Sequence, residues 1–502
     1  MSSFSHSWMK MKDWLSKWAV YSPNHIAIKE YETGKTYTYA ELNTAANQLA
    51  NQLTAEYELR NTDRVAIIAE NCAEYVILLS VAQKTGIIIV PLNYRLAVGE
   101  IDYLLQNAQP KMVIWEAKFA HLVTSTPTFE SIKHQIPLEN LASIYQNATQ
   151  KTFQAVEIED NHPAFILYTS GTTGFPKGAI YSHQMLFWNS VNTAISLVIN
   201  AESRTVNCMP PFHTGGLNVL LTPFLHRGGF VCLMKQFDAA AVLRLLESEK
   251  ATLFMGVPTI LKMMADEPYF AEANFPNLKY FIVGGEPMPV PLIEKWATKN
   301  VPVRQGYGMT EVGPNLTSLH QDDAIEKKGS IGRANFYVQT KVVNEKGEEV
   351  APNESGELLL KGPMVTPGYW ENQEATDKAI KDGWFYTGDR VVQDEDGYFY
   401  VVDRIKNMFI SGGENVYPAE VERILIQHEA VSEVVVIGVP HEKWGEVGKA
   451  FVVLNDHQTF DLETLQSFCH QKLSKFKIPK HLEILEALPK NASGKIDRKS
   501  LK

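Results

Sequence analysis

Cysteine, long apolar runs and positive charge are all scarce in this chain of 502 residues, and each scarcity excludes a class of protein. The 4 cysteines stand far apart and none forms a Cys-x-x-Cys pair, which speaks against a zinc site or a disulfide framework. A formal net charge of -10 argues against a general nucleic-acid binder, which would show a basic excess. No apolar run reaches the length of a transmembrane helix.

Signals for targeting are also scarce. The amino-terminal region lacks the apolar core of a signal peptide, and the first arginine is Arg60, which speaks against an arginine-rich transit peptide. The last residues, Ser500-Leu501-Lys502, differ from the peroxisomal Ser-Lys-Leu signal. With so few cysteines, we predict a cytoplasmic protein with at most peripheral membrane contact. The sequence leaves the oligomeric state open.

The amino-terminal region does carry an amphipathic pattern. Trp8, Met11, Leu15 and Trp18 fall on one helical face, with lysines on the opposite face. A helix that lies on a membrane surface has this pattern. We favour the alternative, a helix packed on its own domain, because amphipathic helices usually face a core.

The remaining pattern predicts an α/β fold. Hydrophobic residues at 45% and charged residues at 21% are ordinary for a globular protein, and the length exceeds that of one compact core. Apolar, β-branched runs at 64–69 and 86–91 flank a helical stretch at 73–82, as buried parallel strands flank a crossover helix. Residues 337–365 resemble a β-meander with hairpin turns.

A change of pattern near 403–407 predicts a domain boundary. After it comes a small α+β unit of about a hundred residues, a normal domain size, with strands expected at 434–439 and 450–454. We therefore predict a large domain of several subdomains, with parallel-rich sheets and a β-rich segment, over residues 1–403. A small, mobile α+β domain is predicted over residues 404–502.

The strongest local signal is a loop of glycine and hydroxyl residues that follows an apolar strand. It reads Tyr168-Thr169-Ser170-Gly171-Thr172-Thr173-Gly174-Phe175-Pro176-Lys177-Gly178. Glycines let backbone N–H groups approach a phosphate closely, and the hydroxyl groups add further donors. Lys177 adds a positive charge for phosphate oxygens. This composition predicts a phosphate-binding loop.

The loop is not a Walker A motif, which needs Gly-x-x-x-x-Gly-Lys-Ser/Thr. Counting from Gly171, Pro176 takes the place of the second glycine and Gly178 takes the place of the hydroxyl residue. The alternative interpretation is a surface turn with a solvated lysine. Six consecutive glycine or hydroxyl residues closed by Pro-Lys-Gly disfavour that alternative.

Further segments of glycine and polar residues follow: 211–216, 283–287, 305–311, 386–389, 403–407, 411–422 and 489–496. Each is a weak signal by itself. A lone histidine such as His213 is more often structural than catalytic. Glu311 offers the oxygen ligand that Mg²⁺ prefers, yet its glycine-rich neighbourhood also suits a helix-capping turn. Asp389 either accepts ribose hydroxyls or closes an ordinary turn.

Together these motifs resemble those of the adenylate-forming superfamily, which contains acyl-CoA synthetases, firefly luciferases and the adenylation domains of nonribosomal peptide synthetases. The resemblance covers nearly the whole chain and its motifs occur in the expected order. It implies an enzyme that uses ATP, Mg²⁺ and coenzyme A to activate a small-molecule carboxylic acid. Two half-reactions are implied, formation of an acyl-adenylate with release of pyrophosphate and then attack by the thiol of coenzyme A.

The resemblance also implies roles for individual residues. Nucleotide binding is implied for Thr169, Ser170, Gly171, Thr172, Thr173, Gly174, Lys177, Gly284, Gly285, Glu286, Gly306, Tyr307, Gly308, Met309, Thr310, Asp389, Arg404 and Lys495. Catalytic roles are implied for Lys495, His213 and Thr310, and metal binding for Glu311. Lys406 is implied as the hinge, and Ser411, Gly412 and Gly413 as the lining of the coenzyme A tunnel. Many relatives carry an acidic residue at the position of Asn407, so the electrostatics of the hinge stay open.

The acid is harder to predict than the reaction. Residues 212–221 contain no acidic side chain for an amino group, which disfavours an amino acid. The expected pocket segments, 217–221, 255–259 and 309–315, are small or apolar. We predict a medium- or long-chain fatty acid, because residues 412–418 resemble those of bacterial fatty acyl-CoA synthetases, with an aromatic acid as the alternative. A luciferase-like oxygenase or a catalytically silent nucleotide-binding protein would share the same motifs.

Overall fold

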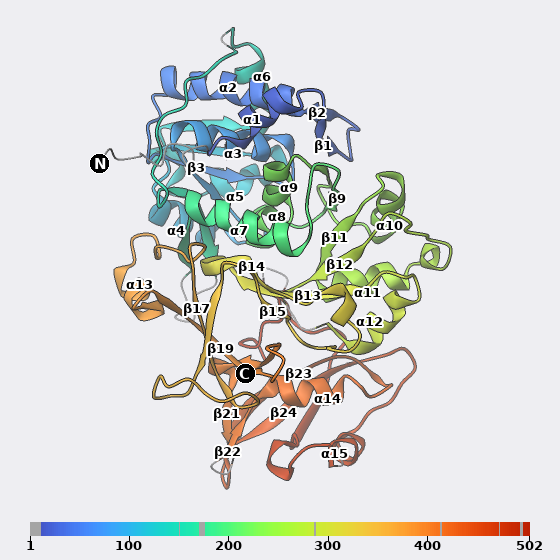
Figure 1. Ribbon diagram of the computed structural model, residues 1–502. Helices are drawn as coiled ribbons and strands as arrows, with labels where there is room; N and C mark the ends of the chain where they lie inside the picture. The colour runs from blue at the N-terminus through green and yellow to red at the C-terminus, as the bar shows by residue number, and fades with distance from the viewer. Residues whose placement is uncertain are drawn as a thin grey trace, which may run out of the picture. The chain divides into compact units, whose positions relative to one another are not determined.

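The computed structural model describes residues 12–149, 151–169, 176–285, 288–411, 414–470, 472–491 and 495–501. The chain forms two compact units, shown in Figure 1. The first unit contains Met1–Lys328, Gly332–Gln339 and Lys361–Phe385, and the second contains Gly329–Ile331, Thr340–Leu360 and Tyr386–Lys502. The division by contacts therefore assigns part of the predicted β-rich segment to the carboxyl-terminal unit. The boundary at 403/404 stays a prediction about a hinge.

A six-stranded sheet of the first unit has the order β6-β5-β3-β4-β7-β8. Its strands are β3 (Arg64–Ile68), β4 (Ile88–Pro91), β5 (Met112–Trp115), β6 (His134–Pro137), β7 (Pro163–Thr169) and β8 (Lys177–Ser182). Neighbours from β6 to β7 are parallel, and β8 is antiparallel to β7. The predicted strands and crossover helix at 64–91 are confirmed as β3, α3 (Ala73–Thr85) and β4. Their apolar runs are continuous because both faces of this sheet are buried.

Two further sheets complete the first unit (Figure 1). One has the order β2-β1-β10-β9, with β1 (Ile26–Glu30), β2 (Thr36–Thr38), β9 (Arg204–Asn207) and β10 (Phe230–Leu233). The other has the order β11-β12-β13-β14-β15, with β11 (Leu253–Gly256), β12 (Tyr280–Val283), β13 (Val303–Met309), β14 (Gly313–Ser318) and β15 (Arg333–Ala334). In the latter, β11 to β13 are parallel and β13 to β15 are antiparallel. The first unit is thus rich in parallel pairs, as predicted.

The helices of the first unit begin and end at recognisable signals. They are α1 (Trp14–Tyr21), α2 (Tyr39–Ala55), α3, α4 (Val98–Ala108), α5 (Ala120–Thr124), α6 (Leu138–Gln146), α7 (His183–Ser196), α8 (Thr214–Asn218), α9 (Leu221–Arg227), α10 (Ala239–Ser248), α11 (Pro258–Asp266), α12 (Val290–Ala297) and α13 (Gln373–Ala379). Thr38 and Glu41 form a capping box at the start of α2. The Ser182 hydroxyl caps α7, and α3 ends at Gly86, whose φ of 75° suits glycine.

The second unit consists mainly of two antiparallel-rich sheets and two helices. Its elements are β16 (Gln339–Val343), β17 (Ser355–Lys361), β19 (Trp384–Gln393), β20 (Phe399–Arg404), β21 (Phe409–Ser411), β22 (Glu414–Val416), α14 (Pro418–Leu425), β23 (Val431–His441), β24 (Gly445–Leu454), α15 (Leu462–His470) and β25 (His481–Ile484). The short β18 (Ile380–Lys381) pairs with the start of β19. The two strands predicted after the boundary are confirmed as the long β23–β24 hairpin.

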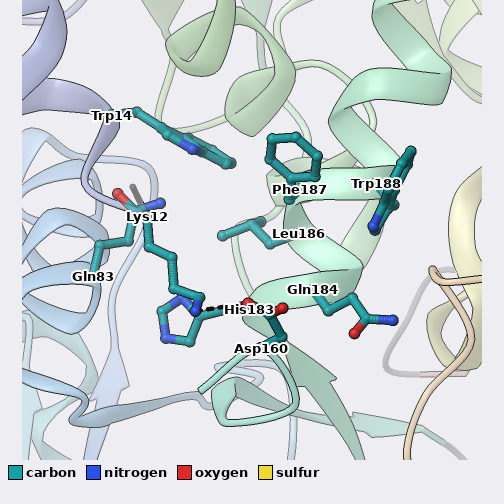
Figure 2. Close-up of a pocket in the computed structure, with 9 residues that line it drawn as sticks. All are labelled: Lys12, Trp14, Gln83, Asp160, His183, Gln184, Leu186, Phe187 and Trp188. Carbon is teal, nitrogen blue, oxygen red and sulfur yellow. Dashed lines mark ion pairs between the residues drawn. The ribbon is translucent and has the colours of Figure 1, made fainter. Parts of the chain in front are cut away.

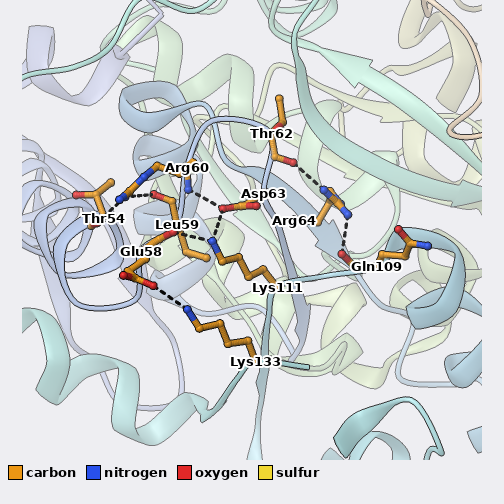
Figure 3. Close-up of polar contacts among 10 residues, drawn as sticks. All are labelled: Thr54, Glu58, Leu59, Arg60, Thr62, Asp63, Arg64, Gln109, Lys111 and Lys133. Carbon is orange, nitrogen blue, oxygen red and sulfur yellow. Dashed lines mark hydrogen bonds and ion pairs between the residues drawn. The ribbon is translucent and has the colours of Figure 1, made fainter. Parts of the chain in front are cut away.

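The amino ends of the parallel strands β3, β5 and β6 are tied together by charged side chains (Figure 3). Asp63 accepts hydrogen bonds from the backbone N–H of Arg60 at 2.7 Å and from the ammonium of Lys111 at 3.1 Å. Arg64 donates to the carbonyl oxygens of Thr62, Ala108 and Gln109. This end of the sheet is therefore occupied by its own polar contacts, whereas the predicted phosphate loop follows the carboxyl end of β7.

The amino-terminal helix packs on its own unit over the part that the structure describes. Trp14 and Leu15 are buried, and the Trp18 indole donates a hydrogen bond to the His226 carbonyl at 3.0 Å. Trp8 and Met11, the other members of the predicted apolar face, lie outside the described residues. Within the described ranges, no helix combines the length and the hydropathy needed to cross a bilayer.

Candidate active site

Two paired strand ends flank the predicted phosphate loop. β7 ends at Thr169 and β8 begins at Lys177, and these two residues are partners in the antiparallel ladder. Ser170, Gly171, Thr172, Thr173 and Gly174 of the predicted nucleotide set lie outside the described residues. Sheet pairing therefore fixes the two residues at which the loop starts and ends, and both of them carry a side chain suited to a phosphate.

Glu311 lies beside the start of this loop. It belongs to a single 3-10 turn, Thr310–Val312, that follows β13, and it is only 8% exposed. Its Oε1 accepts hydrogen bonds from the Tyr369 phenol at 3.0 Å and from the Thr169 hydroxyl at 3.4 Å. Its carbonyl oxygen accepts the backbone N–H of Thr366 at 2.7 Å. The structure thus brings together two predicted site residues, Thr169 and Glu311, that are far apart in the sequence.

Tyr369 is a site residue that the sequence reasoning missed. It lies beside β8, where Tyr369 bridges to Ala179 and Trp370 donates to the Gly178 carbonyl at 2.7 Å. The Lys177 ammonium lies 5.4 Å from the centre of the Tyr369 ring. Burial, and then the Glu311 carboxylate, raise the pKa of the phenol well above its usual value, so it remains a donor at neutral pH. The Gly-Tyr-Trp sequence at 368–370 was the available signal.

Two glycine-rich segments are predicted to contact the nucleotide. They lie at the carboxyl ends of two neighbouring parallel strands, β12 and β13. Val283 of β12 pairs with Gln305 of β13, so Gly284 lies beside Gly306, and a Cβ on Gly284 would stand 3.2 Å from the Gly306 carbonyl. Gly285 has φ 87°, a conformation that favours glycine. A Cβ on Gly308 would stand 2.2 Å from the backbone of Pro314, which excludes any larger residue. Glu286 lies outside the described residues.

The remaining predicted residues of this segment, Tyr307, Met309 and Thr310, are half-buried. They continue from the end of β13 into the turn that carries Glu311. Parallel strands place their carboxyl ends at one edge of a sheet, which is where ligands bind in open α/β sheets. The predicted adenine segment and the predicted metal ligand therefore lie at one edge of the same sheet.

His213 precedes the five-residue helix α8 and is half-buried. Its ring lies 4.7 Å from that of Phe212, which is buried. A Cβ on the neighbouring Gly215 would meet only the Met255 methyl group, at 3.9 Å. A Cβ on Gly285 would meet only Val257, also at 3.9 Å. The histidine segment and the glycine segment thus both face the carboxyl end of β11.

In the second unit, Asp389 and Arg404 form an ion pair. They are partners in the β19–β20 ladder, and the Arg404 Nε lies 2.6 Å from Asp389 Oδ1. The aspartate side chain is 2% exposed, whereas the arginine side chain is 41% exposed. The two residues that the resemblance assigned to the nucleotide are therefore adjacent in this unit.

The structure shows why an asparagine suits position 407, where many relatives carry an acidic residue. The short turn Ile405–Asn407 contains Lys406, and Asp403, whose side chain is buried, comes shortly before this turn in the sequence. That carboxylate accepts hydrogen bonds from the Arg404 backbone at 2.6 Å, the Asn407 side-chain amide at 3.1 Å and the Ala419 backbone at 2.7 Å. An amide at position 407 donates a hydrogen bond to this carboxylate, whereas an ionised acidic side chain has no proton to donate.

The last predicted residues are also in the second unit. Ser411 is buried at the end of β21, and Gly412 and Gly413 lie outside the described residues. Lys495 is exposed, and its backbone exchanges hydrogen bonds with Asn491, at 3.1 Å to the side chain and 2.7 Å to the backbone N–H.

A small cavity lies beside the first turns of α7, and none of its lining residues belongs to the predicted site (Figure 2). Its volume is about 20 Å³, room for a water molecule. It is lined by Lys12, Trp14, Gln83, Asp160, His183, Gln184, Leu186, Phe187 and Trp188. Lys12 forms a 2.8 Å ion pair with Asp160. Among the described residues, neither ring nitrogen of the buried His183 has a hydrogen-bond partner.

This combination of parallel sheets with a hydroxyl- and glycine-rich loop at a strand end defines a class, the nucleotide-binding α/β proteins. Comparison with known families narrows the class. The model of the AMP-binding enzyme family matches residues 15–370, and that of the AMP-binding enzyme C-terminal domain matches residues 420–495. The chain belongs to the AMP-binding enzyme family.

Curated relatives and solved structures agree with this assignment. A feruloyl-CoA synthase from an Amycolatopsis species is 37% identical over 96% of both chains. A long-chain-fatty-acid–CoA ligase from Mycobacterium tuberculosis is 37% identical over 97% of both chains. The o-succinylbenzoate CoA synthetase of Bacillus subtilis with its acyl-adenylate has a TM-score of 0.88 at 33% identity, over 98% of both chains. A second structure of it, with ATP and a magnesium ion, has a TM-score of 0.86 at 32% identity, over 97% of this chain and 99% of that chain.

Proposed function

We propose that this protein joins a carboxylic acid to coenzyme A through an acyl-adenylate, with ATP as the energy source. It is an AMP-forming acid–thiol ligase, as its family and its similarity to acyl-CoA ligases over almost the whole chain indicate. The observation that carries the proposal is the cluster of Thr169, Lys177, Tyr369 and Glu311 around the phosphate loop. It combines a charge for phosphate oxygens with a buried carboxylate for a metal ion.

Mg²⁺ fits the residues present. It prefers oxygen ligands, and Glu311 supplies a carboxylate beside the phosphate loop. Within the described part of the chain, both hydrogen bonds to this carboxylate reach Oε1, which leaves Oε2 to a cation. The ion would neutralise negative charge on the phosphates during the reaction. The Bacillus subtilis relative with ATP and a magnesium ion supports this proposal.

In the first half-reaction the substrate carboxylate attacks the α-phosphate, and the bond to pyrophosphate breaks. We assign Lys177 and the loop to the departing phosphates, and the segment Gly306–Thr310 with Gly284 and Gly285 to the nucleotide. His213 is assigned to the acid, because it faces the same strand end as these glycines. Lys495 is assigned to the charge that develops between carboxylate and α-phosphate. Positioning and charge stabilisation thus carry the chemistry.

In the second half-reaction the thiolate attacks the acyl carbonyl carbon and AMP leaves. We assign the tunnel for coenzyme A to the segment 411–413 and the hinge between the two half-reactions to Lys406. The buried Asp403 holds the backbone on either side of this hinge, at Arg404 and at Ala419. Asp389 and its partner Arg404 are assigned to the ribose and phosphate of the nucleotide.

For the acid we propose a medium- or long-chain fatty acid. Leu217, Leu220 and Leu221 of the expected pocket segment are buried, and a Cβ on Gly215 would lie 3.9 Å from the Met255 methyl group. Apolar walls suit an alkyl chain. An aromatic acid is the second candidate, because the similarity to a feruloyl-CoA synthase is as high as that to a long-chain-fatty-acid–CoA ligase.

A pyrophosphate-release assay tests the proposal. The purified protein is supplied with Mg·ATP and with fatty acids of increasing length or aromatic acids, each with and without coenzyme A. We expect pyrophosphate release with at least one acid, acyl-CoA only when coenzyme A is present, and higher kcat/KM for fatty than for aromatic acids. Release that favours aromatic acids would contradict the proposed substrate but not the reaction.

Two outcomes would overturn the reaction itself. Nucleotide binding without pyrophosphate release from any acid would indicate a silent binding protein. Light emission with a luciferin would indicate an oxygenase. The variant Lys495→Ala should lose pyrophosphate release while it still forms acyl-CoA from supplied acyl-adenylate, and loss of both steps together would contradict the role of Lys495.

A further inference from the structure

The short helix α8 ends in three carbonyl groups that are satisfied by side chains from other elements. The last carbonyls of any helix lack partners within the helix. Here the Gly216, Asn218 and Val219 carbonyl oxygens each accept a hydrogen bond from the side-chain amide of an asparagine. The three donors are Asn207, Asn189 and Asn315, which we call the asparagine clamp. Each comes from a different element: β9, α7 and β14.

The clamp is buried and its bonds are short. Asn207 donates to Gly216 at 2.9 Å and Asn189 donates to Asn218 at 2.7 Å. The exposed fractions of the two asparagines are 6% and 1%. Amides that are removed from water need partners, and a donor lost here would leave a buried carbonyl unsatisfied. These bonds therefore restrict where α8 can lie.

Asn315 connects the clamp to the strand that follows Glu311. Its amide donates to the Val219 carbonyl at 3.2 Å and to the Thr193 hydroxyl at 2.6 Å. Its own carbonyl accepts the Asn335 side chain at 2.9 Å. Asn315 lies in β14, which begins at Gly313 directly after the turn of Glu311. One residue thus ties α7, the end of α8 and this strand together.

A helix of five residues has little stability of its own, so tertiary contacts decide its position. The other end of α8 begins immediately after His213, and no side-chain cap bond holds that end. The clamp joins α8 to three other elements, through Gly216 in the middle of the helix and through Asn218 and Val219 at its carboxyl end. A shift of α8 would move the imidazole and Gly215 together.

We propose that Asn189, Asn207 and Asn315 are positioning residues that set α8, and with it His213, relative to the strand following Glu311. The inference rests on the proposed function, in which His213 faces the acid and Glu311 faces the phosphates. A shift of α8 would displace one wall of the site proposed for the acid, while the segments proposed for the nucleotide stay in place. Loss of the clamp would therefore weaken binding of the acid more than binding of ATP.

Three alanine variants, Asn189→Ala, Asn207→Ala and Asn315→Ala, test the clamp. The matched control is Asn47→Ala, because Asn47 lies in α2, is 8% exposed and donates a 3.0 Å hydrogen bond to the Lys151 carbonyl. For each clamp variant we expect kcat/KM for the acid to fall about tenfold, mainly through KM. The KM for ATP should change by less than about twofold. The control should lower the unfolding midpoint without changing the KM for the acid.

Clamp variants that lose stability as Asn47→Ala does and keep the wild-type KM for the acid would overturn the proposal. Equal changes in the KM values for acid and ATP would also overturn it. Should an alanine variant not fold, the serine variant at the same position keeps a shorter donor, and a smaller shift in the same KM is expected. Absence of pyrophosphate release from the wild-type protein would instead overturn the proposed function.

Discussion

At the scale of single residues, Tyr369 determines how the Glu311 carboxylate is held. The phenol lies between that carboxylate and Lys177, which starts β8. Its raised pKa keeps it protonated, so it donates a hydrogen bond instead of competing as a second anion. Glu311 is thereby oriented through one oxygen. A residue that does not itself belong to a glycine loop thus contributes to the predicted metal site.

Replacement of this residue gives a direct prediction. Tyr369→Phe removes the hydroxyl group that donates to Glu311 and keeps the ring beneath Lys177. Hydrogen bonds to charged groups contribute about 1.5–3 kcal/mol, so we expect kcat/KM for Mg·ATP to fall at least about tenfold. A pyrophosphate-release assay at several Mg²⁺ concentrations measures the change, and more Mg²⁺ should be needed for half-maximal rate.

The matched control is Tyr269→Phe. Tyr269 donates a 2.9 Å hydrogen bond to Glu247 in the same unit but far from the loop. It should leave the dependence on Mg²⁺ unchanged. An unchanged dependence in Tyr369→Phe as well would show that the phenol does not orient the metal ligand.

At the scale of elements, the amino end of helix α14 is capped by a residue from strand β20. The helix begins at Pro418, and Asp403 at the end of β20 accepts the backbone N–H of Ala419 in its first turn. The same carboxylate holds Arg404 and Asn407. Side-chain caps of this kind replace the partners that the first helical N–H groups lack. The segment of the predicted hinge and the start of α14 are thus held by one side chain.

The variant Asp403→Asn tests this arrangement. It keeps the shape but removes the charge and one acceptor, so we expect the free energy of unfolding to fall by about 1–3 kcal/mol. Chemical denaturation followed by fluorescence measures it. The comparison variant is Asp461→Asn, because the Asp461 carboxylate is exposed and accepts the backbone N–H of Thr464 near the start of α15. A loss as small as that of the comparison variant would contradict the role of Asp403 as a shared acceptor.

At the scale of the whole molecule, two histidines with lowered pKa values make stability depend on pH, the buried His183 and the half-buried His226. Burial first, and then nearby positive charge, lowers the pKa of His183 to about 3 and that of His226 to about 3, from an ordinary 6.5. His183 lines the cavity of Figure 2, and His226 contacts the Ser190 hydroxyl at 2.8 Å. Both imidazoles are therefore neutral in the folded protein at neutral pH.

The direction of the effect follows from proton binding. Below pH 6.5 the unfolded chain binds protons on these imidazoles and the folded protein does not, so stability is lost as the pH falls from about 6.5 towards 3. Each histidine contributes roughly 1.4 kcal/mol per pH unit in this range. Denaturant unfolding between pH 7.5 and 4.5 should show this loss.

His183→Phe should reduce the slope of unfolding free energy against pH by about one proton, because the ring remains but no longer titrates. The exposed His457 gives the control, and His457→Gln should leave the slope unchanged. A slope equal to that of the wild type in His183→Phe would contradict the assignment of acid sensitivity to this buried ring.

The sequence alone predicted much of the fold. The continuous apolar runs at 64–69 and 86–91 predicted buried strands, because an exposed strand alternates polar and apolar residues, and the structure confirms them as β3 and β4. The glycine, hydroxyl and lysine groups of the loop from Tyr168 to Gly178 form a local pattern that predicted phosphate binding, and the resemblance of this pattern to the adenylate-forming superfamily implied the reaction class. Patterns of this kind can be recognised from neighbouring residues alone, because they do not depend on contacts between distant parts of the chain.

Only the tertiary structure decided which distant groups act together. Tyr369 donates a hydrogen bond to Glu311, which lies 58 residues earlier in the sequence. Asp403 caps a helix that begins fifteen residues later. The three asparagines of the clamp meet at α8 from three separate elements. A single tyrosine, aspartate or asparagine has no pattern in the sequence, because its role depends on the partner that folding places within hydrogen-bond distance. The sequence by itself therefore determined the sheets and the chemistry of the loop, and folding determined which side chains hold the site in place.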